Sequence, residues 1–228
     1  MMDYYEVNSI SRAFMPLTAN KIHKITNGLG SVINLAYQPV MSQSTRLSFN
    51  GGAHIFEDFY QSSGNAMSPQ LDVVPALTVV GQVEQIVPQV APANPYFVNL
   101  KSALTFYIYG NSRVDLLRGF LGFGKITTQT YACNNAPCFE KGARTTTTYR
   151  QDFPFTGQPL SSESRTASGA LISRSTNVYD VKKEGTGYNT VYFPFVKKTM
   201  EESYEIGRYA GLVKTTSTEN SYGDAFGN

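Results

Sequence analysis

Hydrophobic and polar side chains alternate, residue by residue, along much of this 228-residue chain. Between residues 99 and 109, for example, Leu104, Phe106 and Ile108 alternate with Thr and Tyr side chains. Successive side chains of a β-strand point to opposite faces of a sheet, so this period of two predicts strands. The same pattern, bounded by Gly, Asn, Pro or Ser, predicts strands at 32–37, 79–87, 125–131, 144–149, 171–181, 190–196 and, less regularly, 197–206. We therefore expect an all-β fold of antiparallel strands and hairpins.

Composition narrows the class of protein further. Only 16% of residues are charged and 41% are hydrophobic, with 19 Gly and 11 Pro, which excludes a disordered tail and a long coiled coil. The net charge of +2 lacks the clustered basic excess of a nucleic-acid binder, so we expect no nucleic-acid partner. The longest apolar stretches, such as 73–80, are much shorter than the roughly 20 residues that cross a bilayer, so we expect no membrane span. The first residues, MMDYYE, lack the positive charge that opens a signal peptide.

Catalytic motifs are scarce in this sequence. The chain has two histidines, His23 and His54, and it lacks a Gly-x-Ser-x-Gly elbow, a His-Glu-x-x-His motif and a P-loop. The run GFLGFG at 119–124 spaces its glycines in the reverse order of a dinucleotide fingerprint, and its Phe side chains would crowd a phosphate. We expect this run to be a tight, aromatic-packed β turn. The sequence thus predicts neither an enzyme nor a bound cofactor.

Two cysteines, Cys133 and Cys138, lie close together between two Thr-rich segments. A hairpin loop of this length can close a disulfide if it brings the Cα atoms within roughly 4.4–6.8 Å of each other. A zinc site formed with His23 and His54 is an alternative, although the two histidines lack the spacing of a zinc knuckle. A Cys-His nucleophile pair is a third alternative, for which the sequence identifies no positioning residue.

Aromatic residues on the predicted strands suggest a binding function. Tyr107, Tyr109 and Tyr192 are expected to be exposed, where a phenol ring can stack on a sugar. The simpler interpretation is that these rings cover a sheet face or pair across strands.

Three runs of the sequence resemble a known family. They are 118–125 (RGFLGFGK), 145–160 (TTTTYRQDFPFTGQPL) and 173–179 (SRSTNVY). They closely resemble the Rhs/YD-repeat proteins of bacterial toxin complexes, specifically the SpvB/TcdB-like B component. Upstream, 24–30 and 33–37 resemble the Gly-Leu-Gly hairpin of that family and the strand that follows it. Downstream, 212–216 and 222–228 are similar to a strand and a degenerate Tyr-Asp repeat turn.

The resemblance implies a segment of a β-shell. Proteins of this family wind many short hairpins into a hollow shell that encloses a toxic C-terminal polypeptide before delivery, and each repeat needs stacked neighbours. It also implies a secreted or extracellular protein whose partners are other segments of the shell or other toxin-complex subunits. No catalytic residue carries over. The residues that the resemblance assigns to structural motifs are Gly28, Gly30, Arg118, Gly119, Gly122, Tyr149, Arg150, Asp152, Gly157 and Tyr179.

Three regions are expected along the chain: an N-terminal extension at 1–20, a β-rich region at 21–113 and a YD-repeat-like hairpin region at 114–228. Within the second, 38–69 is polar and lacks a period, which predicts a long loop or irregular hairpin. The last repeat turn has no strand after it, so we expect a fragment of a longer strand series. The leading hypothesis is a non-enzymatic shell segment, and the alternative is a free-standing β-sheet module that binds glycan or a partner protein through exposed Tyr.

Overall fold

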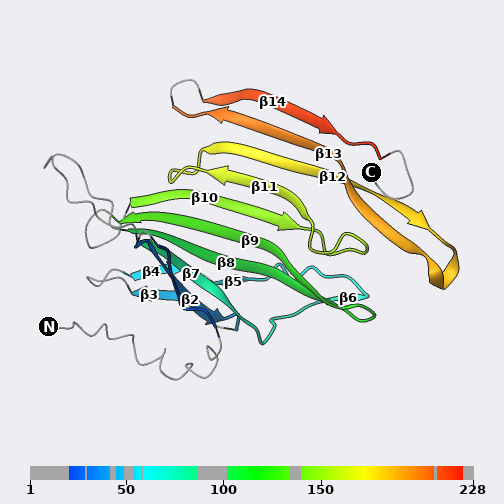
Figure 1. The fold of residues 1–228 in the computed structure, drawn as a ribbon, viewed down its shortest axis with the longest axis horizontal. Helices are drawn as coiled ribbons and strands as arrows, with labels where there is room; N and C mark the ends of the chain where they lie inside the picture. The colour runs from blue at the N-terminus through cyan, green and yellow to red at the C-terminus, as the bar shows by residue number, and fades with distance from the viewer. Residues whose placement is uncertain are drawn as a thin grey trace, which may run out of the picture.

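In the residues that it describes, the structure, a computed structural model, contains one sheet of twelve strands and one of two strands (Figure 1). It describes residues 21–28, 30–41, 45–48, 54–57, 59–86, 102–133, 140–207 and 210–222. The all-β class expected from the alternation is confirmed, and every pairing is antiparallel except that of β5 with β8. The strands are β1 (Lys24–Thr26), β2 (Val32–Pro39), β3 (Thr45–Ser48), β4 (His54–Glu57), β5 (Tyr60–Gln61), β6 (Gln70–Asp72), β7 (Thr78–Ile86), β8 (Ser102–Asp115), β9 (Gly119–Cys133), β10 (Glu140–Tyr149), β11 (Pro159–Arg165), β12 (Leu171–Glu184), β13 (Val191–Glu205) and β14 (Gly211–Glu219).

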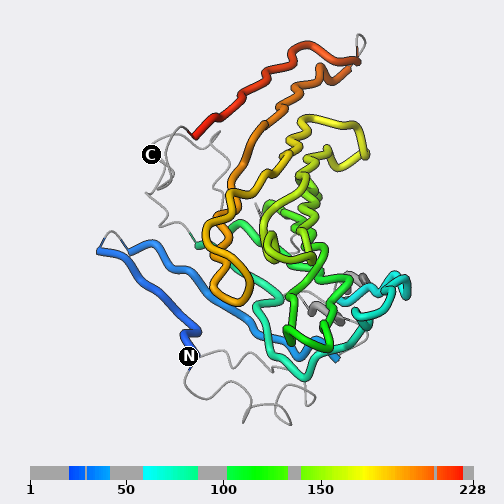
Figure 2. The backbone as a smooth tube through the Cα atoms, turned by 90° about the vertical axis from the view of Figure 1, so that its right-hand side faces the viewer, coloured from blue at the N-terminus to red at the C-terminus, as the bar shows by residue number. Residues whose placement is uncertain are grey.

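Strand order in the large sheet largely follows the chain. The path runs β1-β2-β7-β8-β9-β10-β11-β12-β13-β14, and β5 and β6 both pair with β8. From β7 onward each strand therefore pairs with the next one in sequence. Figure 2 shows β13 and β14 extending away from the strands around β8. Because β8 runs through residues 113 and 114, the two regions expected on either side of that point share a strand.

The predicted strands agree with the structure wherever they fall on described residues. Even the least regular segment, 197–206, forms the second part of β13. β11 was not predicted. The segment 38–69, expected to be a long loop or irregular hairpin, includes the end of β2, the paired strands β3 and β4, and β5.

Buried side chains concentrate on β8 and β9. Leu104, Phe106 and Ile108 are each at most 5% exposed, and they alternate with less buried residues as the sequence pattern predicted. Tyr109, expected to be exposed, is instead buried. The ring of Phe59 packs edge-on against the ring of Tyr109 at a centroid distance of 5.6 Å. The Tyr109 hydroxyl donates a 2.9 Å hydrogen bond to the carbonyl of Val80.

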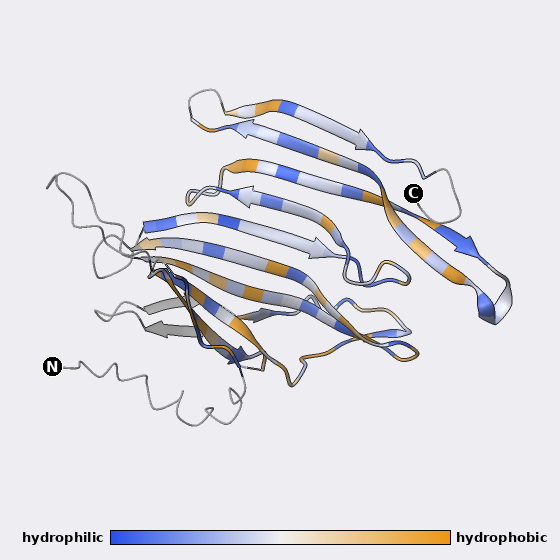
Figure 3. Ribbon diagram, in the orientation of Figure 1, coloured by the Kyte–Doolittle hydropathy of each residue, from blue (hydrophilic) through white to orange (hydrophobic). Residues whose placement is uncertain are grey.

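The sheet from β10 to β14 has a different character. None of the residues in these five strands is buried, and the strands contact their neighbours within the sheet. Figure 3 shows mostly polar or neutral residues along β10 and β11. Among the residues that the structure describes, this part of the sheet is therefore one layer thick, whereas the part around β8 contains the core.

Candidate functional site

Neighbouring strands β9 to β13 place two rows of hydroxyl side chains on one face, which we call the hydroxyl face. The TTTT run of β10 accounts for one residue in each row, because alternate Thr residues of a strand point to the same face. All of its members are half-buried except Ser203, which is exposed. In register order the first row contains Thr128, Thr145, Ser164, Ser173 and Ser203, and the second contains Thr147, Ser162 and Ser175.

Hydroxyl groups bond to one another across the strands. On the hydroxyl face, Thr145 Oγ1 donates to Ser164 Oγ at 3.2 Å, and the hydroxyls of Thr147 and Ser162 are 3.1 Å apart. The opposite face repeats this chemistry, with 2.7 Å between the hydroxyls of Thr148 and Ser161. Cross-strand pairs of this kind stabilise a sheet without a hydrophobic layer behind it.

Alternating charges cross the opposite face, which we call the ladder face. Glu163 on β11 bonds to Arg165 at 2.9 Å and to Arg174 on β12 at 2.8 Å. Arg174 continues to Glu202 on β13 at 3.5 Å, and the hydroxyl of Tyr204 donates to Glu202 at 2.8 Å. The hydrogen bond from Arg165, followed by that from Arg174, holds the pKa of Glu163 below its usual range. The rows on both faces are thus polar, and the same strands also expose apolar side chains, among them Leu160, Val178, Phe193 and Val213.

Several motif residues meet in the loop between β10 and β11. The guanidinium of Arg150 lies 4.0 Å from the ring centroid of Phe155 and 5.9 Å from that of Tyr179, and it forms an ion pair with Asp152. The hydrogen bond from Arg150 lowers the pKa of Asp152. Gly157, at φ +81°, donates from its amide to the carbonyl of Arg150 at 2.8 Å and closes the loop.

A second cation and ring contact involves the turn before β9. Arg118 lies 4.2 Å from the ring centroid of Phe153, whose ring packs edge-on against Tyr192 at 4.9 Å. The run 119–124, expected to be a turn, instead begins β9, and the turn residues are 116–118. Gly119 and Gly122 have φ near +80°, which favours glycine. Gly119 pairs with Asp115 at the hairpin turn, and Gly122 lies where β8 and β9 shift register.

The remaining motif residues lie apart from this loop or at its margin. Gly28 and Gly30 belong to the turn between β1 and β2, and Gly30 has a φ of +82°. Tyr149 ends β10 at a register shift opposite Pro159. The hydroxyl of Tyr179 donates to the carbonyl of the same Pro159 at 2.7 Å. The motif residues therefore form turns and clasps rather than one shared site.

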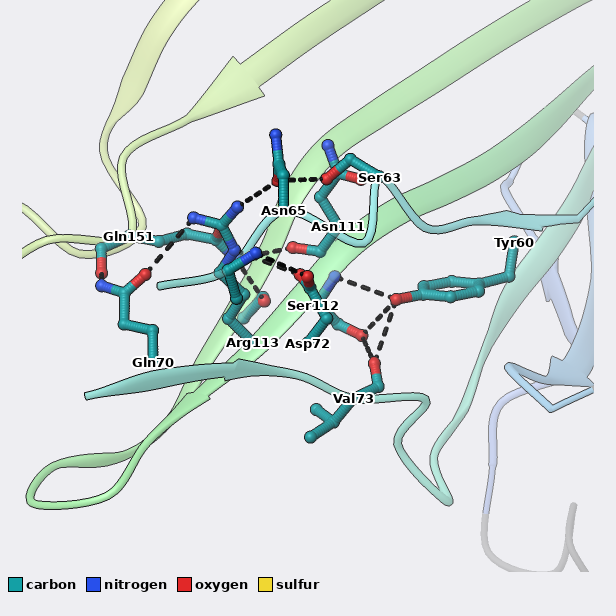
Figure 4. Close-up of polar contacts among 12 residues, drawn as sticks. Tyr60, Ser63, Asn65, Gln70, Asp72, Val73, Asn111, Ser112, Arg113 and Gln151 are labelled. Carbon is teal, nitrogen blue, oxygen red and sulfur yellow. Dashed lines mark hydrogen bonds and ion pairs between the residues drawn. The ribbon is translucent and has the colours of Figure 1, made fainter. Parts of the chain in front are cut away.

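Gln151 lies between two motif residues and joins the loop to the core strands (Figure 4). Its side-chain nitrogen donates to the carbonyl oxygens of Asn111 and Gly122 at 2.7 and 3.0 Å. The backbone carbonyl of Gln151 accepts a 2.9 Å hydrogen bond from the side-chain nitrogen of Gln70. Because Gln151 is only 9% exposed, these bonds satisfy polar groups that water reaches poorly.

The same cluster ties the segment around β6 to β8. Arg113 forms an ion pair with Asp72 at 3.3 Å and donates to Asn65 at 2.6 Å. Ser112, fully buried, donates its hydroxyl to the carbonyl of Val73, and the hydroxyls of Ser112 and Tyr60 are 2.8 Å apart. These groups bind one another, which is the chemistry of a structural clasp. No sequence motif marked them.

The cysteine alternatives fall on undescribed parts of the chain. Cys133 ends β9, but its side chain, Cys138 and the side chain of His54 lie outside the described residues, and so do the disulfide and zinc hypotheses. His23 is exposed and packs edge-on against Tyr37 at 5.6 Å. Among the described residues, no three His, Cys, Asp or Glu side chains are grouped to hold a metal ion.

No helix in the described part of the chain is long and apolar enough to cross a membrane. No protein-family model matches this chain, and no curated protein matches it. Its function is therefore inferred from the chemistry of its own surfaces and from the resemblance of its sequence motifs.

Proposed function

We propose that this chain is a non-enzymatic wall segment of a YD-repeat toxin-complex protein, whose β-shell encloses and helps deliver a toxic C-terminal polypeptide. The observation that carries the proposal is the sheet from β10 to β14, which is one layer thick among the described residues and carries polar rows on both faces. Most sheets bury at least one hydrophobic face against a second layer. A sheet with polar rows on both faces suits a wall that water contacts from inside and outside.

The way this wall is stabilised fits the same role. The hydroxyl rows and the charge ladder link each strand to the next, so the sheet can grow sideways without a core. Neither set of side chains offers an apolar surface to an enclosed polypeptide.

The kind of shell is inferred from the sequence resemblance to YD-repeat proteins. Arg150, Asp152, Gly157 and Tyr179, which the resemblance assigns to structural motifs, gather at the loop that joins β10 to β11. A loop that fixes two wall strands is what a structural repeat requires. This arrangement supports a structural role for the motif residues.

Adjacent serines on β11 allow a direct test, because Ser161 lies on the ladder face and Ser162 on the hydroxyl face. We would introduce Ser161→Cys or Ser162→Cys together with Cys133→Ser and Cys138→Ser, in the protein as its host produces it. If one face of the sheet borders an enclosed space, a bulky maleimide should label the cysteine on the other face quickly. It should label the enclosed cysteine only after unfolding. The isolated 228-residue chain is the control, in which both positions should react.

Rapid labelling of both positions in the host-produced protein would overturn the wall proposal. That result would mean that neither face borders an enclosed space. It would favour the free-standing module.

A further inference from the structure

Strand β14 is the last strand of the large sheet, and within the described part of the chain it pairs with β13 alone. The amide of Asn220 donates to the carbonyl of Lys197 at 2.9 Å, which continues the register of Thr218 with Thr199. In an antiparallel pair, backbone groups of every second residue point to the same neighbour. Thr218 and Thr216 therefore bond toward β13, and the backbone N–H and C=O groups of Thr215, Ser217 and Glu219 point to the open edge.

The start of β14 carries a register shift at Val213 and the charge of Lys214, which hinder strand pairing, whereas the stretch from Thr215 to Glu219 contains neither a bulge nor a lysine. All nine residues of β14 are exposed, and none is proline. Its lysine, Lys214, makes no ion pair with the described residues. Glu219, in contrast, is already paired with Lys198 at 2.9 Å. An exposed, unprotected edge is a template for another strand.

The rows on β14 indicate which side chains a neighbouring strand should carry. The first hydroxyl row reaches Ser203 and then ends at Lys214, and the second leads through Glu201 to Thr216. A following strand would continue the pattern with a carboxylate opposite Lys214 and hydroxyl groups opposite Thr215 and Thr216. Opposite charges directly across a strand pair are favourable.

We propose that the open edge of β14 is a strand-addition site for an antiparallel strand that is rich in Ser and Thr and places a carboxylate opposite Lys214. This inference rests on the proposed function, since the added strand would be the next strand of the wall. Within this chain, β11 has the required order. Placing Glu163 opposite Lys214 sets Ser162 opposite Thr215 and Ser161 opposite Thr216.

A synthetic peptide that copies β11, Pro159–Arg165, is the probe. N-methyl groups on its residues 161 and 163 block the peptide edge that faces away from β14, so that peptides do not stack on one another. Amide hydrogen exchange of the full 228-residue chain is measured by NMR with and without excess peptide. We expect exchange at Thr215 and Ser217 to slow by on the order of fivefold, because these amides gain the carbonyl oxygens of peptide residues 162 and 160 as partners.

Two matched comparisons make the test specific. A peptide with Glu163→Lys should protect these amides much less, because it places a lysine opposite Lys214. In the protein, Ser217→Pro removes an N–H that points outward and should abolish protection, whereas Ser217→Ala keeps the N–H and should retain it. Unchanged exchange at Thr216 in both variants would show that the pairing of β14 with β13 survives.

The inference is overturned if no peptide slows exchange at the outward amides, or if both peptides do so equally. Self-association of the chain through β14 in preference to the peptide would also overturn it, because the occupant would then be a second copy. These outcomes are separate from the maleimide test. Peptide binding reports on the edge, whereas labelling reports on the two faces.

Discussion

Gly124 on β9 leaves very little room for a side chain. A Cβ at this position would lie 2.8 Å from Gln151 Oε1 and 3.1 Å from the backbone oxygen of Asn111. Because the backbone of Asn111 cannot move as a flexible side chain can, we expect Gly124→Ala to lower the free energy of unfolding by about 1–3 kcal/mol. Urea denaturation followed by circular dichroism measures this loss.

Gly28→Ala is the matched control, since a Cβ at Gly28 would meet nothing within 4 Å. Its free energy of unfolding should change by no more than about 0.5 kcal/mol. Equal losses in the two variants would show that the contact with Gln151 is not the cause. Adding Gln151→Ala to Gly124→Ala should cost less than the sum of the two single changes, because the residues touch.

Tyr109 gives a prediction about alkaline pH. Burial raises the pKa of Tyr109 to about 12, from an ordinary value of 10.0. The folded state thus favours the neutral phenol, so its contribution to stability is complete below pH 10 and is lost as the pH rises toward 12. Absorbance titration of phenolate should show a late component that Tyr109→Phe removes. A titration curve unchanged by Tyr109→Phe would contradict the assignment.

Single residues were predicted unevenly, for physical reasons. Alternation identified Leu104, Phe106 and Ile108 as one buried face, because that face is fixed by the strand itself. Tyr109 was expected to be exposed, but Phe59, fifty residues earlier, covers it. Gln151 had no local signal either, since its partners lie on β8 and β9 and only the fold brings them together.

The charge ladder makes an element-level prediction about acid. The folded-state pKa of Glu163 lies below its ordinary value of 4.5. The carboxylate therefore stabilises the sheet above about pH 4.5, and this contribution is lost as the pH falls through the folded-state pKa. Glu163→Gln should lower the melting temperature by only about 1–3 °C at pH 7, because partly exposed ion pairs contribute little. The difference from the parent protein should shrink in acid.

Glu201→Gln is the control for this experiment. Glu201 lies on β13, on the hydroxyl face, and is exposed. Its replacement should leave the pH dependence of the melting temperature unchanged. If Glu163→Gln and Glu201→Gln behave alike between pH 3 and 7, the ladder does not stabilise β11 against β12 and β13.

Strand prediction succeeded where a strand has its own apolar alternation. It failed where the strand is stabilised by side-chain partners on the adjacent strands. β8 alternates clearly, and it was predicted. β11, with the sequence PLSSESR, lacks such a pattern. It is a strand because hydroxyl and ionic partners on β10 and β12 bond to it. The hydroxyl face and the ladder face were missed for the same reason, since both exist only once strand register is set.

For the whole molecule, the structure predicts a steep gradient in sensitivity to mutation. Leu104 is 2% exposed at the centre of the core, whereas Leu212 on β14 is 54% exposed. We expect Leu104→Ala to cost about 2–5 kcal/mol, and Leu212→Ala to stay within about 0.5 kcal/mol. Thermal denaturation of both variants tests this. A comparable loss in Leu212→Ala would mean that β14 is covered in solution.

The same gradient should be visible in hydrogen exchange across the sheet. Amides in the middle of β8 and β9 combine ladder bonds with a buried face, so in the isolated chain they should exchange slowest. Amides of β13 and β14 rely on a single polar layer and should exchange faster, with the outward amides of β14 fastest of all. In the host-produced protein, a neighbouring strand would slow exchange at β14 and leave β8 unchanged. Slow exchange at the outward amides of β14 already in a monomeric isolated chain would contradict the open edge, because these N–H groups would then have partners within the chain itself.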